Sequence, residues 1–355
     1  MRHTERTGRV ILVDIAAVVV VMSIIGDPST GRMMAAGTTT VQRVNYSDIG
    51  TDPDLREIFI GRCADFKAGK VNPTVDLNEL RMKNCTKLWE LFSSTFKYRE
   101  ACDVNQTMYE EFVNAAAITI PANKSNFWDG WGIYDTVHAY AKEGRRAWSL
   151  EYTLVGYLIN NLKFCGQKNE TGFRYDSCPG MDECGFATGC ADAFWAEASV
   201  YFAKQAKGHV RVLFDSNREG GAFQNENSYF AQFELINMRP EAVDNVNIYL
   251  ITMVDQETGD NCSSSSIQQL TTILTQRGIS YTCHDQPRDV LHLLCTDEIA
   301  SEECLLQKDI LESPTDVALP LTTGSASRTR STIGVGCHAF IVISIYILHS
   351  ILHYT

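Results

Sequence analysis

The sequence predicts a two-lobed α/β (α+β) fold, with a helical N-terminal lobe and a C-terminal lobe built on a small parallel β-sheet flanked by helices. Three observations predict it. Residues 54–204 repeat apolar residues at spacings of three and four, the period of amphipathic helices. The segments 209–215 and 245–254 are nearly continuous apolar runs rich in β-branched residues, as buried parallel strands are. A helical pattern at 264–278 follows them, as in βαβ units.

The elements of the helical lobe, about 45–204, are amphipathic segments. They are expected at 85–96, 108–117, 152–162 and 191–206. The segment AITIP, 117–121, is a candidate strand that could join the sheet.

The sheet lobe, about 205–310, alternates strands and helices. Its helix at 264–278 starts among serines and closes on Gly278, and a further strand is expected at 279–284.

Both ends of the chain have the composition of sorting signals. Residues 1–26 join a basic start to an apolar run, which predicts a signal peptide or a signal anchor. Residues 311–332 predict a stalk, and an apolar tail at 333–355 follows. This order favours a GPI-attachment signal over a single membrane span. We therefore expect a GPI-anchored protein on the extracellular face of the plasma membrane.

Cysteines and glycosylation sequons agree with export. The chain has 12 cysteines and no CxxC pair, which favours disulfides over metal binding, and no metal site is predicted. The predicted glycosylation sites are the six sequon asparagines Asn45, Asn84, Asn105, Asn123, Asn169 and Asn261. The net charge of -12 argues against nucleic acid as a partner.

The stretch 227–238, NSYFAQFELINM, places a single carboxylate, Glu234, in an apolar run. Judged from the residues alone, Glu234 is the polar side of a half-buried strand. The alternative is an acid at the floor of a pocket.

Four motifs, taken in their order and spacing, carry a family resemblance. They are WSLEYTLVGYLINNLKFC at 148–165, SCP at 177–179, FWAEAS at 194–199 and NSYFAQFE at 227–234. With the cysteine layout, they resemble the ADP-ribosyl cyclase/NAD glycohydrolase family from about Cys63 to Cys304. The resemblance implies an enzyme that cleaves the nicotinamide–ribose bond of NAD+, with NADP+ as a second candidate substrate and no cofactor beyond the substrate.

The resemblance also implies roles for particular residues. Glu234 falls on the catalytic carboxylate, and Glu151 on an acid that influences whether the product cyclises or hydrolyses. The residues expected to bind substrate are Trp128, Trp131, Trp195, Ser199, Tyr229 and Phe230. Trp128 and Trp131 are alternatives for one site tryptophan, and the wording FWDG favours Trp128.

Some of these residues also have ordinary structural interpretations. Trp195 lies on an amphipathic helix, where it would be a core residue. Glu151 would be a first-turn acid after a Ser149 cap. Arg145 and Arg146 are either surface residues or partners for a pyrophosphate.

The disulfide pairing implied by the resemblance uses ten cysteines. The pairs are Cys63–Cys85, Cys102–Cys184, Cys165–Cys178, Cys262–Cys283 and Cys295–Cys304. Cys337 lies in the tail, and Cys190 is left over. An unpaired cysteine in an exported protein is either a free thiol or part of an intermolecular bridge. A second copy of the chain, forming a homodimer, is a candidate partner.

The chemistry of NAD+ explains why a single carboxylate can suffice. Nicotinamide departs neutral, so no general acid is needed, whereas an ordinary glycosidase needs two carboxylates. One carboxylate can stabilise or trap the developing oxocarbenium ion. Water attack then gives ADP-ribose, and attack by the adenine of the same molecule gives cyclic ADP-ribose.

We expect hydrolysis to dominate, because it is the default fate of an exposed intermediate. The alternatives are an enzyme making mainly cyclic ADP-ribose, a secreted soluble cyclase, and a catalytically silent receptor or adhesion ectodomain.

Overall fold

The computed structural model describes residues 49–226, 228–254, 256–257, 259–295 and 304–305. The expected terminal signals, the stalk, Asn45 and Cys337 lie outside these residues. Within the described ranges, no helix combines the length and apolar character needed to cross a membrane.

The chain divides into two compact units, each discontinuous in sequence. The helical unit draws on Met1–Ala64, Met82–Ala116 and Leu158–Ala198, and the sheet unit draws on Asp65–Arg81, Ala117–Tyr157 and Ser199–Thr355. The sequence pattern predicts instead one change of character near residue 204. The difference arises because 117–157, although mostly helical in pattern, contains a strand of the sheet.

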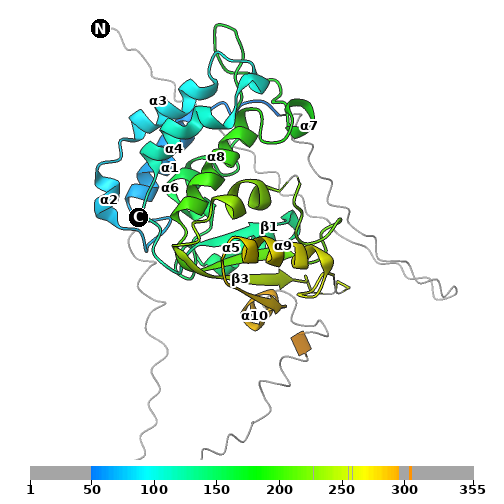
Figure 1. Ribbon diagram of the computed structural model, residues 1–355. Coiled ribbons are helices and arrows are strands. Elements are labelled where there is room, and N and C mark those ends of the chain that lie inside the picture. Colours follow the sequence, from blue (N-terminus) through cyan, green and yellow to red (C-terminus); the bar gives the residue numbers. More distant parts are fainter. Residues whose placement is uncertain (1–48, 227, 255, 258, 296–303, 306–355) are drawn as a thin grey trace, which may run out of the picture. The chain divides into compact units, whose positions relative to one another are not determined.

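The helical unit is built around aromatic side chains. Its helices are α1 (Leu55–Lys67, in part), α3 (Cys85–Phe96), α4 (Glu110–Ala116), α7 (Met181–Cys184) and the first half of α8 (Cys190–Gln205). Phe92 is fully buried, and its ring centroid lies 4.9 Å from that of Phe164 and 5.3 Å from that of Phe112. Figure 1 labels these helices, coloured from blue to green.

The sheet unit contains four parallel strands in the order β1-β2-β3-β4. The strands are β1 (Asn126–Asp129), β2 (Gly208–Asp215), β3 (Val243–Ile251) and β4 (Tyr281–Asp285). The helices of the unit are α2 (Leu77–Arg81), α5 (Tyr134–Ala141), α9 (Ser265–Gln276) and α10 (Arg288–Leu294), with α6 (Leu154–Ile159) and α8 shared between the units. In Figure 1 the sheet lies beside α9, in yellow, and α10, in orange.

Side chains on the two faces of the sheet pack against different elements. On one face, Leu213 of β2 and Ile251 of β3 pack with Val137 of α5 and Val290 of α10. On the other, the Phe127 ring of β1 lies 4.8 Å from that of Phe202 in α8. Both faces are therefore covered, which explains why the strands are nearly continuous in apolar residues.

The expectation of a strand at 117–121 is wrong. The segment is irregular, and the first strand lies further along, at Asn126–Asp129. Both backbone polar groups of Ile118 bind the Tyr201 hydroxyl, at 2.9 Å and 2.7 Å, so they are not used in a strand ladder. Pro121 has no N–H to donate.

Candidate functional site

Glu234 ends a short π-helical turn, Phe230–Glu234, and does not lie on a strand. The interpretation of Glu234 as the polar side of a strand is therefore wrong. The apolar residues of the run hold the turn in place. The Phe230 ring is buried, and its centroid lies 5.3 Å from that of Phe214 and 6.1 Å from that of Phe127. Such turns recur at functional sites because they redirect a side chain out of the regular helical pattern.

The Glu234 carboxyl is buried, with 7% of its surface exposed. Burial is the main cause that raises its pKa well above the usual range, and the nearby charges of Glu151 and Asp129 raise the pKa further. The Ser199 hydroxyl opposes this by donating a hydrogen bond to Glu234 Oε1 at 3.1 Å. Three acidic side chains thus gather in the sheet unit, and a buried acid whose pKa is raised in this way is typical of functional sites.

Glu151 lies on a 3₁₀ turn, Leu150–Tyr152, and is 7% exposed. Its Oε1 accepts a hydrogen bond from Trp128 Nε1 at 3.1 Å. The structural role expected for Ser149 is wrong, because its hydroxyl makes no cap bond. The Thr153 hydroxyl instead accepts from the Gly156 N–H at the start of α6, so Glu151 precedes that helix.

The candidate tryptophans Trp128 and Trp131 lie together. Their ring centroids are 5.6 Å apart, and Tyr134 lies 5.4 Å from Trp128 and 5.9 Å from Trp131. Trp128 is half-buried on β1, whereas Trp131 is 75% exposed. An exposed indole held by neighbouring rings can accept a flat cationic ring on its face.

The ring cluster continues inward through His138. The His138 ring lies 4.3 Å from Tyr134 and 5.4 Å from Tyr152. Tyr152 directly follows Glu151 in the chain, so the ring cluster reaches the turn that carries Glu151.

The structure places the remaining predicted residues as follows. Tyr229 is half-buried beside Phe233, with ring centroids 5.8 Å apart. Phe230 is 1% exposed and belongs to the core. Trp195 belongs to the helical unit, four residues before Ser199 on α8, and its ring lies 5.0 Å from that of Phe194.

Three residues of the cluster were not predicted from the sequence. Asp129, Arg218 and Ser228 are joined by an ion pair of 2.7 Å and a hydrogen bond of 2.6 Å. Asp129 and Ser228 are 99 positions apart in the chain. Asp129 directly follows Trp128 in FWDG, and Ser228 lies within NSYFAQFE, whereas no local pattern marks Arg218.

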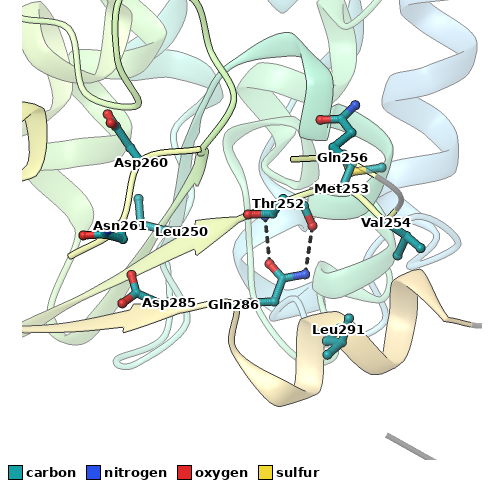
Figure 2. A pocket seen from close by; sticks show the side chains of 10 residues that line it. All are labelled: Leu250, Thr252, Met253, Val254, Gln256, Asp260, Asn261, Asp285, Gln286 and Leu291. Carbon is teal, nitrogen blue, oxygen red and sulfur yellow. Dashed lines mark hydrogen bonds between the residues drawn. The ribbon is translucent and has the colours of Figure 1, made fainter. Parts of the chain in front are cut away.

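A separate hollow of about 180 Å³ lies where β3 and β4 end. Figure 2 shows its lining, with the Gln286 amide bonded twice to the Thr252 backbone, each bond 2.8 Å long. None of the predicted site residues lines it. Asp285 and Asp260 at its rim accept backbone N–H groups of Cys262 and Ala222, so their oxygens already serve the fold.

One grouping of metal-type ligands occurs among the described residues, and it does not fit a metal. Cys262, Cys283 and Asp285 lie together, but the two sulfurs form a disulfide and cannot act as thiolates. Arg145 and Arg146 have other contacts: Arg145 lies 3.7 Å from Glu143, and the Arg146 guanidinium lies over the Tyr140 ring.

All five disulfides implied by the resemblance are formed. They are Cys63–Cys85, Cys102–Cys184, Cys165–Cys178, Cys262–Cys283 and Cys295–Cys304. Cys190 is free and 3% exposed, and burial raises its pKa to about 12. A thiol so buried is not available for an intermolecular bridge in the folded protein.

Five of the six sequon asparagines fall within the described part of the chain, and all five are exposed. They are Asn84, Asn105, Asn123, Asn169 and Asn261.

Comparison with known proteins agrees with these features. A family model described as ADP-ribosyl cyclase matches residues 52–304. An ADP-ribosyl cyclase/cyclic ADP-ribose hydrolase of Aplysia kurodai is 31% identical over 76% of this chain and 93% of its own length. The human ADP-ribosyl cyclase/cyclic ADP-ribose hydrolase 2 is 30% identical over 81% of this chain and 90% of its own.

Two solved structures share the fold. An Aplysia cyclase complexed with substrate NGD and product cGDPR superposes with a TM-score of 0.65 at 31% identity, covering 72% of this chain and 97% of that one. A CD38 structure, described as evidence for a covalent enzyme–substrate complex, gives a TM-score of 0.60 at 30% identity, covering 69% and 96%.

Proposed function

Because the chain belongs to the ADP-ribosyl cyclase family, we propose that it is a cell-surface NAD+ glycohydrolase whose working acid is Glu234. The chain is thus an enzyme acting on an N-glycosyl bond. The observation that carries the proposal is the buried Glu234 carboxyl, hydrogen-bonded by Ser199 and placed in one electrostatic cluster with Glu151.

The proposed reaction begins with heterolysis of the bond between ribose C1′ and the pyridinium nitrogen. The bonding electron pair goes to the nitrogen, so nicotinamide leaves neutral. Positive charge develops on the ribose, and the Glu234 carboxylate stabilises it or adds to C1′. Water then attacks C1′ and loses a proton, giving ADP-ribose.

The ionisation state of Glu234 fits a site that meets a cation. In the free protein, burial favours the neutral acid. A pyridinium brought next to Glu234 favours the carboxylate, because an opposite charge lowers the pKa of an acid. Substrate binding therefore generates the charge that the reaction uses.

The aromatic residues support a place for nicotinamide. We propose that Trp128 and the exposed Trp131 take the cationic ring, with a cation–π contribution of roughly 0.5–1 kcal/mol at an exposed ring. Glu151, held by Trp128, supplies a negative charge to the same region. Ser199 on α8 is assigned to the site as well, because it donates to Glu234.

We propose hydrolysis as the main outcome, with minor cyclisation to cyclic ADP-ribose. We also propose that the protein is exported, which the five disulfides and the exposed sequons support. We further propose a lipid anchor, which the composition of residues 311–355 supports. Release of the protein from cells by a phosphatidylinositol-specific phospholipase tests the anchor.

The experiment that tests the function uses the protein expressed on cells or secreted without its tail. It is incubated with NAD+ and, separately, NADP+, and the products are resolved by chromatography. Nicotinamide with mainly ADP-ribose supports the proposal. Mainly cyclic ADP-ribose would make the protein a cyclase, and no nicotinamide would favour a receptor or adhesion ectodomain.

A further inference from the structure

One ion pair of the sheet unit is partly buried, and the charge of its acid, Asp129, acts on Glu234. Arg218 Nη1 lies 2.7 Å from Asp129 Oδ2, and the two side chains are 21% and 12% exposed. The other ion pairs found among the described residues join side chains that are 36% to 77% exposed. Exposed pairs contribute little to stability, whereas a buried pair must offset a large desolvation cost. This one therefore calls for an explanation.

The pair is connected to the turn that carries Glu234. Asp129 Oδ2 also accepts a hydrogen bond of 2.6 Å from Ser228 Oγ. The same Ser228 oxygen accepts the Ala231 N–H at 3.1 Å, at the start of the π-helical turn. The Asp129 charge also raises the pKa of Glu234. Arg218 thus belongs to the same cluster as the proposed catalytic carboxylate.

The charge balance of this cluster is unfavourable for NAD+ without Arg218. Glu151, Asp129 and Glu234 are three carboxyl groups, and the pyrophosphate of NAD+ is an anion. Arg218 brings a permanent positive charge that is ion-paired within the cluster. A planar guanidinium has five N–H donors, so it can bind one carboxylate and still donate to phosphate oxygens.

The position of the pair in the sheet also favours a ligand. Asp129 is the last residue of β1, and Arg218 follows β2 by three residues. The two strands are adjacent and parallel, so both residues lie at the carboxyl ends of strands. Ligands of open α/β sheets bind at those ends.

We propose that Arg218, held in place by Asp129, is the anchor for the pyrophosphate of NAD+. This inference rests on the proposed function. Asp129 is then a positioning residue: it orients the guanidinium and, through Ser228, fixes the anchor relative to the turn that carries Glu234.

The test compares two substrates with the same scissile bond. NAD+ carries a pyrophosphate, and nicotinamide riboside has no phosphate. In Arg218→Met we expect kcat/KM for NAD+ to fall roughly 10- to 100-fold, the loss typical of hydrogen bonds to a charged group, with kcat/KM for the riboside nearly unchanged. Arg218→Lys should lose only part of kcat/KM for NAD+, because it keeps the positive charge but not the planar set of donors.

Arg288→Met is the matched control, because Arg288 is an exposed arginine at the start of α10. Arg288→Met should leave kcat/KM for both substrates unchanged. A folding defect lowers kcat/KM for both substrates alike, so the ratio of the two kcat/KM values reports on the phosphate contact alone. If the ratio stays at the wild-type value in both Arg218 variants, the inference is wrong. If the wild type itself releases no nicotinamide from NAD+, it is the proposed function that fails.

Discussion

The Ser199 hydroxyl donates a hydrogen bond of 3.1 Å to Glu234 Oε1, and both side chains are buried. This bond is the cause that most lowers the pKa of Glu234 against the effect of burial. It therefore stabilises the charged form of the proposed catalytic acid. Replacing Ser199 should therefore change the pKa of Glu234 in a direction that can be measured.

Ser199→Ala should raise the pKa of Glu234 further, because the carboxylate loses its donor. We expect the acidic limb of the pH profile of kcat/KM to move to higher pH and the activity at pH 7 to fall by about tenfold, the equivalent of about 1.4 kcal/mol. Ser216→Ala is the control, since Ser216 is also 3% exposed but bonds Thr252. If the acidic limb of the pH profile does not move in Ser199→Ala, the Ser199 hydrogen bond does not set the pKa of Glu234.

Glu151→Gln should move the same limb in the opposite direction. The Glu151 charge raises the pKa of Glu234, so removing the charge lowers that pKa. The glutamine oxygen can still accept from Trp128 Nε1. KM for NAD+ should rise, since a negative charge near the pyridinium is lost. Steady-state kinetics between pH 4.5 and pH 8 checks both effects. If the acidic limb moves to higher pH in Glu151→Gln, the Glu151 charge does not raise the pKa of Glu234.

Trp131→Ala should act on binding and leave the fold unchanged. Trp131 is 75% exposed, so its loss removes one stacking face and little core packing. We expect KM for NAD+ to rise about two- to fivefold, matching roughly 0.5–1 kcal/mol for an exposed cation–π contact. Trp128→Phe, which removes the Nε1 donor to Glu151, should instead lower kcat. If KM for NAD+ is the same in the wild type and in Trp131→Ala, Trp131 does not contribute to substrate binding.

The Glu234 carboxyl should also reduce stability near neutral pH. Its folded-state pKa is raised by burial, so the folded protein holds the proton more tightly than the unfolded chain does. The stability linked to this group is fully present below the unfolded-state pKa of about 4.3 and is lost as pH rises towards the folded-state pKa.

Glu234→Gln should therefore raise Tm at pH 7.5, by about 2–4 °C for each kcal/mol, and change it little at pH 4. Calorimetry at the two pH values makes the comparison, with the exposed Glu241→Gln as the control. If the Tm difference between Glu234→Gln and the wild type is the same at both pH values, ionisation of Glu234 does not destabilise the folded protein.

The sequence predicted those parts of the fold in which the local pattern determines the structure. The helix at 85–96 and the strands near 209–215 and 245–254 were predicted because their apolar periodicity matches their burial. The strand Asn126–Asp129 was missed because four residues, one of them an aspartate, make no recognisable run. AITIP has strand composition, but the contact of Ile118 with Tyr201, 83 positions away, overrides it.

The candidate site was predictable only in part. The resemblance indicated Glu234, Glu151 and Ser199, because each lies in a motif. Nothing local indicated the π-helical turn, since the sequence NSYFAQFE fits a strand equally well. Arg218 could not be found, because its significance comes from Asp129, a partner that only the folded sheet brings near.

The most direct test of the account is nicotinamide release from NAD+ by the wild type and by Glu234→Gln at pH 7.5, with circular dichroism confirming that both are folded. The account predicts that Glu234→Gln loses at least about 100- to 1,000-fold in kcat, as expected when a main electrostatic stabiliser of the transition state is removed. A folded Glu234→Gln that retains activity within a few fold of wild type would show that another group does the chemistry.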